Sequence, residues 1–263
     1  MGNDDLNGDA EEEEVVKALL RDAFGESSSS SSAEDDEDVK NPGGGAALIP
    51  NWEKIREIDG LWICKDFLSP DQQSSLLSSI NKEGWLNDAS SNQAMRFGDL
   101  PRWAVELSDS IREAVFFSHG LTESAGVANC DPSEEGSPFP SDLLWREPLF
   151  DQLIMNTYEP GEGICAHVDL MRFEDGIAIV SLESSCIMHF TPADNRDSSN
   201  SHSEKIPVYL NEGSLVLMSG KARYHWKHEI NRKPGFQVWK GREIDQRKRT
   251  SITLRKLCPT AAS

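Results

Sequence analysis

The chain has 263 residues, which is enough for one folded domain plus an extension, and its net charge of −19 is spread unevenly. Residues 1–40 hold 14 acidic and 3 basic side chains, whereas residues 200–263 hold 5 acidic and 13 basic ones; this basic quarter either faces phosphates or forms solvated strand edges. The five scattered cysteines include no C-x-x-C pair, which argues against a disulfide framework and a cysteine zinc site. The sequence shows no apolar leader and no apolar run of about 18 residues, so neither a signal peptide nor a membrane span is expected. These features favour the cytoplasm or nucleus.

The first 45 residues are predicted to be a disordered, acidic and serine-rich extension. A short helix fits Glu12 to Phe24, but serines fill positions 27–32, acidic residues dominate 34–38, and Asn-Pro-Gly-Gly-Gly follows at 41–45. Such a composition buries too little apolar surface to offset the chain entropy lost on folding. The segment is interpreted either as a solvated tether or as an acidic tail that binds a protein partner or is phosphorylated.

Residues 46–148 are predicted to carry a strand at 61–64 and two helices. The first helix follows residues 69–72, Ser-Pro-Asp-Gln, which offer an N-cap serine, a proline at the first helical position and a glutamine that closes a capping box; it ends near Gly84. The second helix spans about 103–117. Its apolar stripe is expected to consist of Leu107, Ile111 and Val115. A long surface loop is expected at 119–142.

From residue 149 onward, short β-rich runs alternate with turn residues. Eight strands are expected at about 151–158, 164–169, 177–182, 185–190, 206–210, 213–218, 222–228 and 249–257. Strands so closely spaced predict a β-sandwich or barrel of the jelly-roll type over residues 149–258, with 259–263 as a tail. The fold class is therefore mainly β with flanking helices.

A candidate metal site begins with His167-Val168-Asp169 at the end of a predicted strand. Strand alternation puts residues i and i+2 on one face, so both side chains point the same way. His228 closes a distant apolar and aromatic run and supplies a third ligand. Two imidazoles and one carboxylate suit a non-haem Fe(II) oxygenase, although zinc also accepts this set and a lone H-x-D is often a surface pair.

The last predicted strand carries a second signal, a row of polar residues between two arginines. Alternation along it places Arg249, Ser251, Thr253 and Arg255 on one face. Such a row is either a solvent-facing edge or, if it points inward, a site for an anion. Because 2-oxoglutarate supplies two electrons to an Fe(II) site and carries a distal carboxylate, a bidentate arginine is the expected partner.

Five motifs in this order resemble the AlkB family of dioxygenases. They are Asn156-Thr157-Tyr158, Pro160-Gly161-Glu162-Gly163, His167-x-Asp169, Arg223-x4-His228 and Arg249-x5-Arg255. The resemblance covers about residues 60–257, and is closest to the branch that hydroxylates or demethylates tRNA wobble uridines. That branch flanks its dioxygenase with an RNA-recognition motif and a methyltransferase domain, neither of which is present in these 263 residues, so the substrate stays open.

The resemblance implies a double-stranded β-helix, residues 149–258, under an N-terminal helical lid, residues 46–148. By position it makes His167, Asp169 and His228 the iron ligands and assigns 2-oxoglutarate to a set of five residues. That set is Asn156, Tyr158 and Arg249, with Ser251 and Arg255 completing the wall. His225 is a rival third ligand, but alternation and the family's Arg-x4-His spacing favour His228. Glu229 stands where the family usually has glycine, which alters the local turn or the rim.

The expected enzyme is a monomer that uses Fe(II), 2-oxoglutarate and O2 to demethylate or hydroxylate an RNA or DNA base. A base has to be flipped or presented single-stranded and stacked on aromatic residues, with cations against phosphate. The candidates are Arg96-Phe97 and Arg172-Phe173, each of which also has an ordinary interpretation as packing or solvated charge. Two alternatives remain: the same chemistry on a protein side chain, and a binding module without activity.

Overall fold

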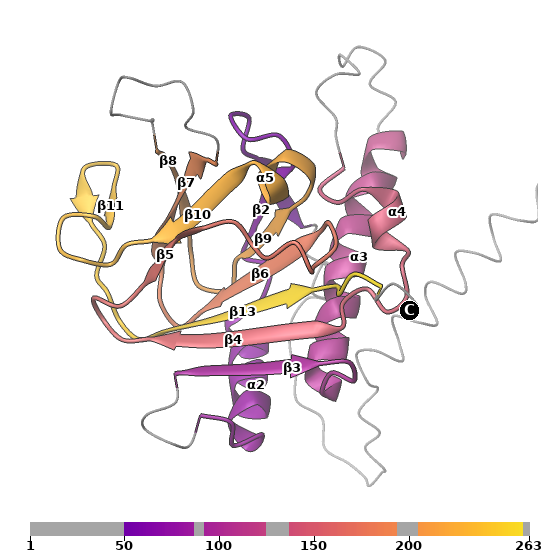
Figure 1. Cartoon of the computed structure of the whole chain (residues 1–263), viewed down its shortest axis with the longest axis horizontal. Helices are drawn as coiled ribbons and strands as arrows, with labels where there is room; N and C mark the ends of the chain where they lie inside the picture. The colour runs from indigo at the N-terminus through magenta and orange to yellow at the C-terminus, as the bar shows by residue number, and fades with distance from the viewer. Residues whose placement is uncertain (1–49, 87–91, 125–136, 194–204, 260–263) are drawn as a thin grey trace, which may run out of the picture. The chain divides into compact units, whose positions relative to one another are not determined.

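The computed structural model describes residues 50–86, 92–124, 137–193 and 205–259, so the predictions for the acidic tail lie outside the described residues. Within them the chain is mainly β with flanking helices, as predicted (Figure 1). The helices are α2 (Pro70–Lys82), α3 (Arg102–Ser124), α4 (Ser141–Leu144) and α5 (Gly220–Tyr224). The strands are β1 (Asn51–Lys54), β2 (Leu61–Lys65), β3 (Gln93–Phe97), β4 (Gln152–Tyr158), β5 (Ile164–His167), β6 (Ile177–Leu182), β7 (Cys186–Pro192), β8 (Ile206–Leu210), β9 (Leu215–Met218), β10 (Trp226–Ile230), β11 (Val238–Trp239), β12 (Arg242–Glu243) and β13 (Arg249–Arg255).

The strands form two facing antiparallel sheets and a small hairpin. The larger sheet has the order β1-β2-β9-β6-β13-β4-β3, the smaller one the order β5-β10-β7-β8, and β11 pairs with β12. Because the chain passes repeatedly from one sheet to the other, neighbours in a sheet are mostly distant in sequence. This arrangement is the predicted double-stranded β-helix, or jelly roll.

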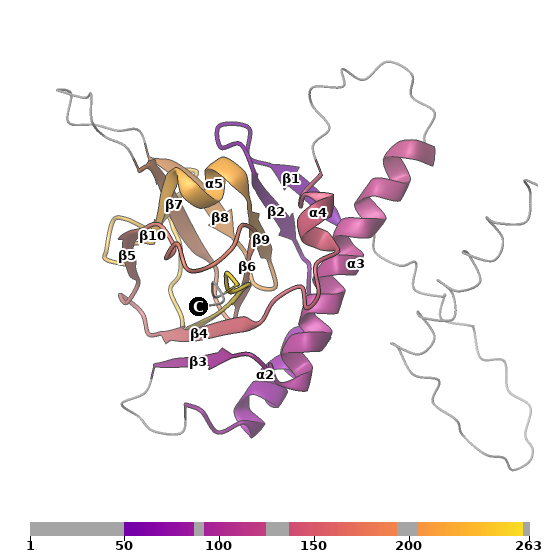
Figure 2. The ribbon, with the colours of Figure 1, turned by 45° about the vertical axis from the view of Figure 1, so that its right-hand side comes forward.

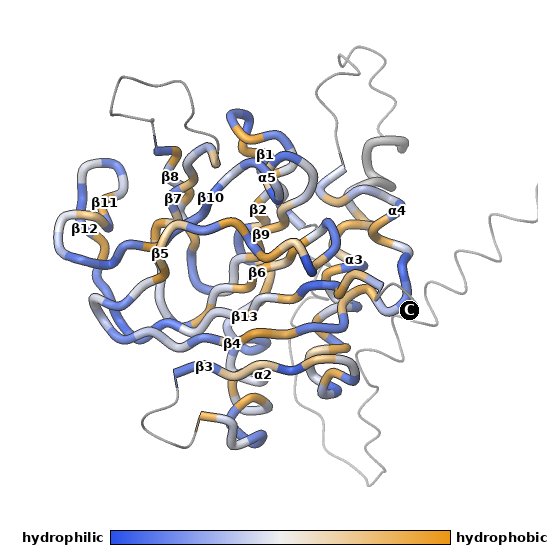
Figure 3. Tube along the Cα trace, in the orientation of Figure 1, coloured by the Kyte–Doolittle hydropathy of each residue, from blue (hydrophilic) through white to orange (hydrophobic). Residues whose placement is uncertain are grey.

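Two hydrophobic cores hold the layers together. The outer core packs one face of the larger sheet, including Leu153 and Ile252, against α2 and α3, which lie along that sheet in Figure 2. The inner core lies between the sheets and joins residues such as Val216 and Phe190. Figure 3 colours the central strands β6 and β9 largely hydrophobic and the β11–β12 hairpin largely hydrophilic. The layers explain why β6 and β9 are buried on both faces.

The two predicted helices form where their sequence signals lie. In α2 the Ser69 hydroxyl accepts from the Gln72 amide at 3.2 Å, while the Ser69 amide donates to the Gln72 side chain at 2.9 Å, so the predicted capping box is confirmed. In α3 the stripe of Leu107, Ile111 and Val115 is at most 5% exposed. No helix among the described residues is both long enough and apolar enough to cross a bilayer.

Two predictions of local structure were wrong in part, and four strands were missed. Residues 222–224 are helical in α5, and the strand begins only at Trp226. Helix α3 continues to Ser124 and α4 forms at 141–144, so much of the described part of 119–142 is helical. The strands β1, β3, β11 and β12 were not predicted; β3 adds an edge to the larger sheet through the register Phe97–Gln152.

Candidate metal centre

The first candidate ligands meet because β5 and β10 are neighbours in the smaller sheet. His167 and His228 are direct register partners in this antiparallel pair, and their ring centroids lie 4.3 Å apart. Asp169 follows two residues after the end of β5, and its Oδ2 lies 3.7 Å from Nε2 of His228. One ligand atom from each of the three residues lies within 4.8 Å of the others. The structure therefore gathers the predicted triad within reach of one ion.

Burial separates His228 from its rival His225. His228 is 5% exposed and faces the interior, whereas His225 is exposed just outside the start of β10. Burial lowers the pKa of His228 to about 4, only partly offset by the nearby Asp169 carboxylate. The imidazole is therefore neutral near pH 7, with a lone pair free to bind a cation.

Neighbouring groups orient the other two candidate ligands. The ring Nδ1 of His167 lies 2.9 Å from the Cys165 carbonyl oxygen. Because a carbonyl oxygen can only accept a hydrogen bond, Nδ1 carries the proton and Nε2 offers its lone pair to a metal ion. Asp169 is 6% exposed, and its Oδ1 lies 2.5 Å from Nη2 of Arg255 on β13. That arginine neutralises the buried carboxylate and fixes its direction.

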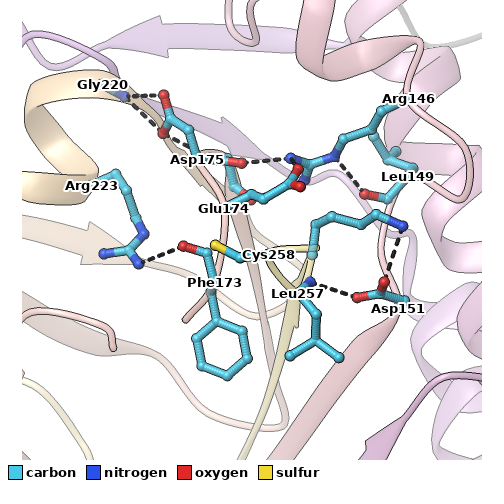
Figure 4. Close-up of polar contacts among 12 residues, drawn as sticks. Arg146, Leu149, Asp151, Phe173, Glu174, Asp175, Gly220, Arg223, Leu257 and Cys258 are labelled. Atoms are coloured by element: carbon cyan, nitrogen blue, oxygen red, sulfur yellow. Dashed lines mark hydrogen bonds and ion pairs between the residues drawn. The ribbon is translucent and has the colours of Figure 1, made fainter. Parts of the chain in front are cut away.

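Arg223 holds the backbone that carries Asp169. It is 2% exposed, and its guanidinium donates to the carbonyls of Asp169 (3.0 Å), Leu170 (2.8 Å) and Phe173 (3.2 Å), the last of which is drawn in Figure 4. Because Arg223 lies in α5, three residues before the start of β10, this clamp ties together the two segments that carry the candidate ligands. The motif Arg223-x4-His228 was recognised from sequence, but this structural role was not.

Two further contacts in Figure 4 fix the far end of the same segment, at Glu174 and Asp175. The Asp175 carboxylate accepts from the Gly220 amide at the start of α5 at 2.9 and 3.0 Å. Arg146 lies 3.4 Å from the Glu174 carboxylate and donates to the Leu149 carbonyl at 2.8 Å. The loop after Asp169 is thus held at both ends while its middle stays exposed.

The polar row of β13 faces the interior between the sheets. Arg249, Ser251 and Thr253 are 1%, 6% and 7% exposed, and β13 lies between β4 and β6 and not at an edge. This excludes a solvent-facing edge. Arg249 donates through Nε to the Ser181 hydroxyl at 3.0 Å, but its buried Nη2 has no hydrogen-bond partner in the described structure. An unpaired buried guanidinium nitrogen fits an anion that completes the site.

The other residues assigned to 2-oxoglutarate lie on the same inward face, to differing degrees. Tyr158 pairs in register with Arg249, whose guanidinium carbon lies 5.7 Å from its ring centroid. Burial raises the pKa of Tyr158, so its hydroxyl stays a donor. Asn156 pairs with Ser251 and accepts from Gln93 at 2.6 Å. Arg255 is engaged by Asp169, and its part in the 2-oxoglutarate wall stays a prediction.

The four predicted substrate residues separate into two groups. Phe97 is 47% exposed, and the guanidinium carbon of Arg172 lies 5.4 Å from its ring centroid, which joins β3 to the loop after Asp169. Arg96 points to the other face of β3, where it stacks on Trp85 at 4.0 Å. Phe173 is 2% exposed and packs below Arg172. Only Phe97 and Arg172 of this set are available to a substrate.

Three further exposed apolar side chains lie on the same two segments as Phe97 and Arg172. Met95, two residues before Phe97 on the same face of β3, is 44% exposed, and Leu170 and Met171 are 61% and 70% exposed. We call Met95, Phe97, Leu170, Met171 and Arg172 the rim. Sequence inspection missed Met95, Leu170 and Met171, because exposed apolar residues look like core residues until the register is known.

Residues 60–255 match the family model of the 2OG-Fe(II) oxygenase superfamily. The chain is 31% identical over 175 residues to tRNA (carboxymethyluridine(34)-5-O)-methyltransferase alkbh8 of Xenopus tropicalis, an alignment that covers 65% of this chain and 25% of the relative. It is 28% identical over 229 residues to the Alkylated DNA repair protein ALKBH8 homolog of Arabidopsis thaliana, covering 76% of this chain and 59% of the relative. The chain therefore spans about a quarter of the first relative and three fifths of the second.

A solved structure of OsALKBH1 shares the fold, with a TM-score of 0.51 and 18% identity over 78% of this chain and 100% of that one. The donor set of two imidazoles and a carboxylate, the buried neutral His228 and the unpaired Arg249 nitrogen all fit iron with 2-oxoglutarate. The chain belongs to the 2OG-Fe(II) oxygenase superfamily, as an AlkB-type dioxygenase that depends on Fe(II) and 2-oxoglutarate.

Proposed function

We propose that this dioxygenase oxidises a C–H bond on a base of RNA or DNA. The observation that carries the proposal is the exposed Phe97 ring with the Arg172 guanidinium 5.4 Å from its centroid, beside the loop that follows Asp169. An exposed aromatic face next to a cation offers stacking to a base and charge to its phosphate. Two relatives are named for tRNA and for alkylated DNA, which supports the same substrate class.

In the proposed site His167, Asp169 and His228 hold the iron, and Arg249, Tyr158 and Asn156 bind the distal carboxylate of 2-oxoglutarate, next to Ser251 and Arg255. When bound, iron and 2-oxoglutarate with O2 supply the oxidation: one oxygen atom enters the substrate C–H bond and the other enters succinate, with release of CO2. A hydroxylated N-methyl carbon then leaves as formaldehyde.

The protein's own contribution is positioning. Arg255 pairs with the Asp169 carboxylate and fixes its direction, and the contact of Nδ1 of His167 with the Cys165 carbonyl leaves Nε2 for the ion. Arg223 holds the backbone of the rim segment at a fixed distance from the ligands. The rim then places the base, since Phe97 and Arg172 come from separate segments that both end at this side of the site.

The experiment is a succinate- and formaldehyde-release assay over alkylated oligonucleotides, bulk tRNA and methylated proteins. We expect turnover above background with a nucleic acid and formaldehyde only if the target is an N-methyl group. Phe97→Ala should raise KM for that substrate with little change in the uncoupled release of succinate, whereas Phe116→Ala, an exposed aromatic on α3, should leave KM unchanged. Turnover with methylated proteins alone would replace this proposal by the protein substrate, and no turnover with any substrate would favour a binding module.

A further inference from the structure

The β11–β12 hairpin projects from the smaller sheet and has no role in the site described above. It comprises residues 233–243, Lys-Pro-Gly-Phe-Gln-Val-Trp-Lys-Gly-Arg-Glu. We propose that this hairpin is a second contact surface for single-stranded nucleic acid, binding nucleotides that flank the reacting base. The inference rests on the proposed function and adds to it a surface that uses three of the thirteen basic residues in the C-terminal quarter of the chain.

The hairpin is firmly anchored to the sheet on one face. Gln237 is 1% exposed; its Oε1 accepts from the Ile187 amide at 2.7 Å, and its Nε2 donates to the carbonyls of Ile187 (3.1 Å) and Asn231 (2.8 Å). Trp239, two residues later on the same face, stacks on Tyr209 of β8 at 5.5 Å and 25°. Three hydrogen bonds and one stacked ring fix the hairpin in place, so its outer face is preorganised.

That outer face presents apolar side chains to solvent. Phe236 and Val238 alternate with the buried Gln237 and are 50% and 40% exposed. A folded hairpin held by Gln237 and Trp239 gains little stability from an exposed phenyl ring, which stays in contact with water. An exposed aromatic side chain on a rigid support is the geometry on which an unpaired base stacks.

Three exposed cations lie along the hairpin that carries Phe236. Lys233, Lys240 and Arg242 are exposed, and none of their side chains forms an ion pair with another described residue. Glu243, the register partner of Val238, carries the one negative charge among residues 233–243, and its carboxylate accepts from the Gly235 amide at 3.0 Å. By contrast, Lys205 just before β8 pairs with Glu229. The three free cations make the hairpin locally positive on a chain whose net charge is −19.

Free cations beside a stacking platform favour a single strand over other partners. A duplex keeps its bases paired, so it would contact the cations and leave Phe236 unused. An acidic peptide would satisfy the charges but offers no ring face in general. Only a strand with unpaired bases uses both features at once, and its phosphates give the binding a characteristic salt dependence.

The test compares a long strand with a minimal substrate, using the full-length protein. Affinity for a labelled, unmodified single-stranded RNA of about 12 nucleotides is measured by fluorescence anisotropy across salt concentrations. Phe236→Ala should weaken this affinity at least about fivefold, and Phe236→Trp should restore it. The triple variant Lys233→Gln, Lys240→Gln, Arg242→Gln should lower the slope of log K against log salt by about 2, the value for three phosphates of a single strand.

The minimal substrate is a trinucleotide that carries the oxidisable base. Both hairpin variants should keep wild-type KM and kcat for it, because it does not reach the hairpin. Matched controls on the other side of the fold are Phe116→Ala and the triple variant Arg56→Gln, Lys82→Gln, Arg102→Gln, which removes the same charge from exposed positions. These controls should bind the long strand like the wild type, apart from a small uniform electrostatic change.

Three results would overturn the proposal. The first is unchanged long-strand affinity in both hairpin variants, and the second is an equal loss in the control variants. The third is an acidic peptide with the sequence of residues 1–40 whose binding is weakened by the hairpin variants, while the binding of RNA is not weakened by them. The binding assay needs neither iron nor an alkylated base, so its outcome is distinct from failure of the proposed activity itself.

Discussion

Replacement of Arg249 tests the assignment of the 2-oxoglutarate carboxylate. The side chain is 1% exposed, bonds to Ser181 through Nε and leaves Nη2 unpaired in the described structure. In Arg249→Met the anion loses its bidentate, charged partner while Tyr158 and Asn156 stay in place. We expect 2-oxoglutarate to bind far more weakly and the ligand-free fold to change little, because removing an unpaired buried N–H offsets the loss of the Ser181 bond.

The size of the effect follows from the energy of a buried charge pair. Truncating one partner costs about 2–5 kcal/mol, or roughly a 30- to 5000-fold rise in Kd. At a 2-oxoglutarate concentration of about 100 times the wild-type Kd, bound ligand stabilises the wild type by about 2.7 kcal/mol. For a domain of this size that corresponds to a Tm rise of roughly 5–11 °C. A variant with about 100-fold weaker binding gains only about 0.4 kcal/mol, or about 1 °C.

The assay is thermal unfolding with and without 2-oxoglutarate, with Mn(II) in place of iron so that no turnover occurs. Arg249→Met should lose the ligand-induced rise in Tm while its ligand-free Tm stays within about 4 °C of the wild type. Arg249→Lys keeps the charge but not the planar fork, and should recover only part of the rise. A full ligand-induced rise in Arg249→Met would refute the carboxylate assignment.

Three further predictions concern the ligand set, the packing and the thiols. Arg255→Met leaves the Asp169 carboxylate without its cationic partner and should weaken Mn(II) binding roughly 10- to 100-fold in calorimetry; unchanged affinity would contradict its orienting role. Gly163→Ala puts a Cβ 1.9 Å from a β10 carbonyl oxygen, so Tm should fall by at least about 5 °C, and a wild-type Tm would show that the backbones can separate. Burial raises the pKa of Cys64 to about 11, so at pH 8 only about one thiol in a thousand is ionised, and iodoacetamide should modify the exposed Cys258 far faster in peptide mapping; equal rates would contradict this burial.

Much of the fold was predictable because its signals are local. The capping box of Ser69 and Gln72 fixes the start of α2, and short β-rich runs between turn residues locate the strands predicted after residue 149, although the one predicted at 222–228 begins only at Trp226. The jelly-roll class follows from their number and spacing. The strand prediction for 222–224 was wrong because this segment runs directly into the aromatic residues from Tyr224 to Trp226, whereas the start of α5 is held by the Asp175 carboxylate at the Gly220 amide, 45 residues away in sequence.

The site was predictable to the extent that its residues sit in recognisable motifs. His167, Asp169 and His228 come together because β5 and β10 pair, as the motif order implied. The substrate residues were harder, since alternation along β3 allows either Arg96 or Phe97 to face the site. The register of β3 on β4 decides between them, and registers between strands far apart in sequence depend on the whole sheet.

The clamp by Arg223 illustrates what sequence alone does not reveal. Its three acceptors are backbone carbonyls more than 45 residues earlier, and a carbonyl carries no residue identity. The inward direction of the β13 row likewise depends on which face of the larger sheet packs on the helices, the face to which Ile252 and Leu254 belong. Such contacts follow from topology, which explains why they became visible only in the folded chain.

The most direct test of the iron site compares two histidines three residues apart. His228 is buried beside Asp169 and His167, whereas His225 is exposed and outside the triad. Mn(II) stoichiometry and substrate-dependent succinate release are measured for His228→Ala and His225→Ala. We predict that His228→Ala loses both while His225→Ala keeps one bound ion per chain and wild-type turnover. Full turnover in His228→Ala, or its loss in His225→Ala alone, would contradict the account.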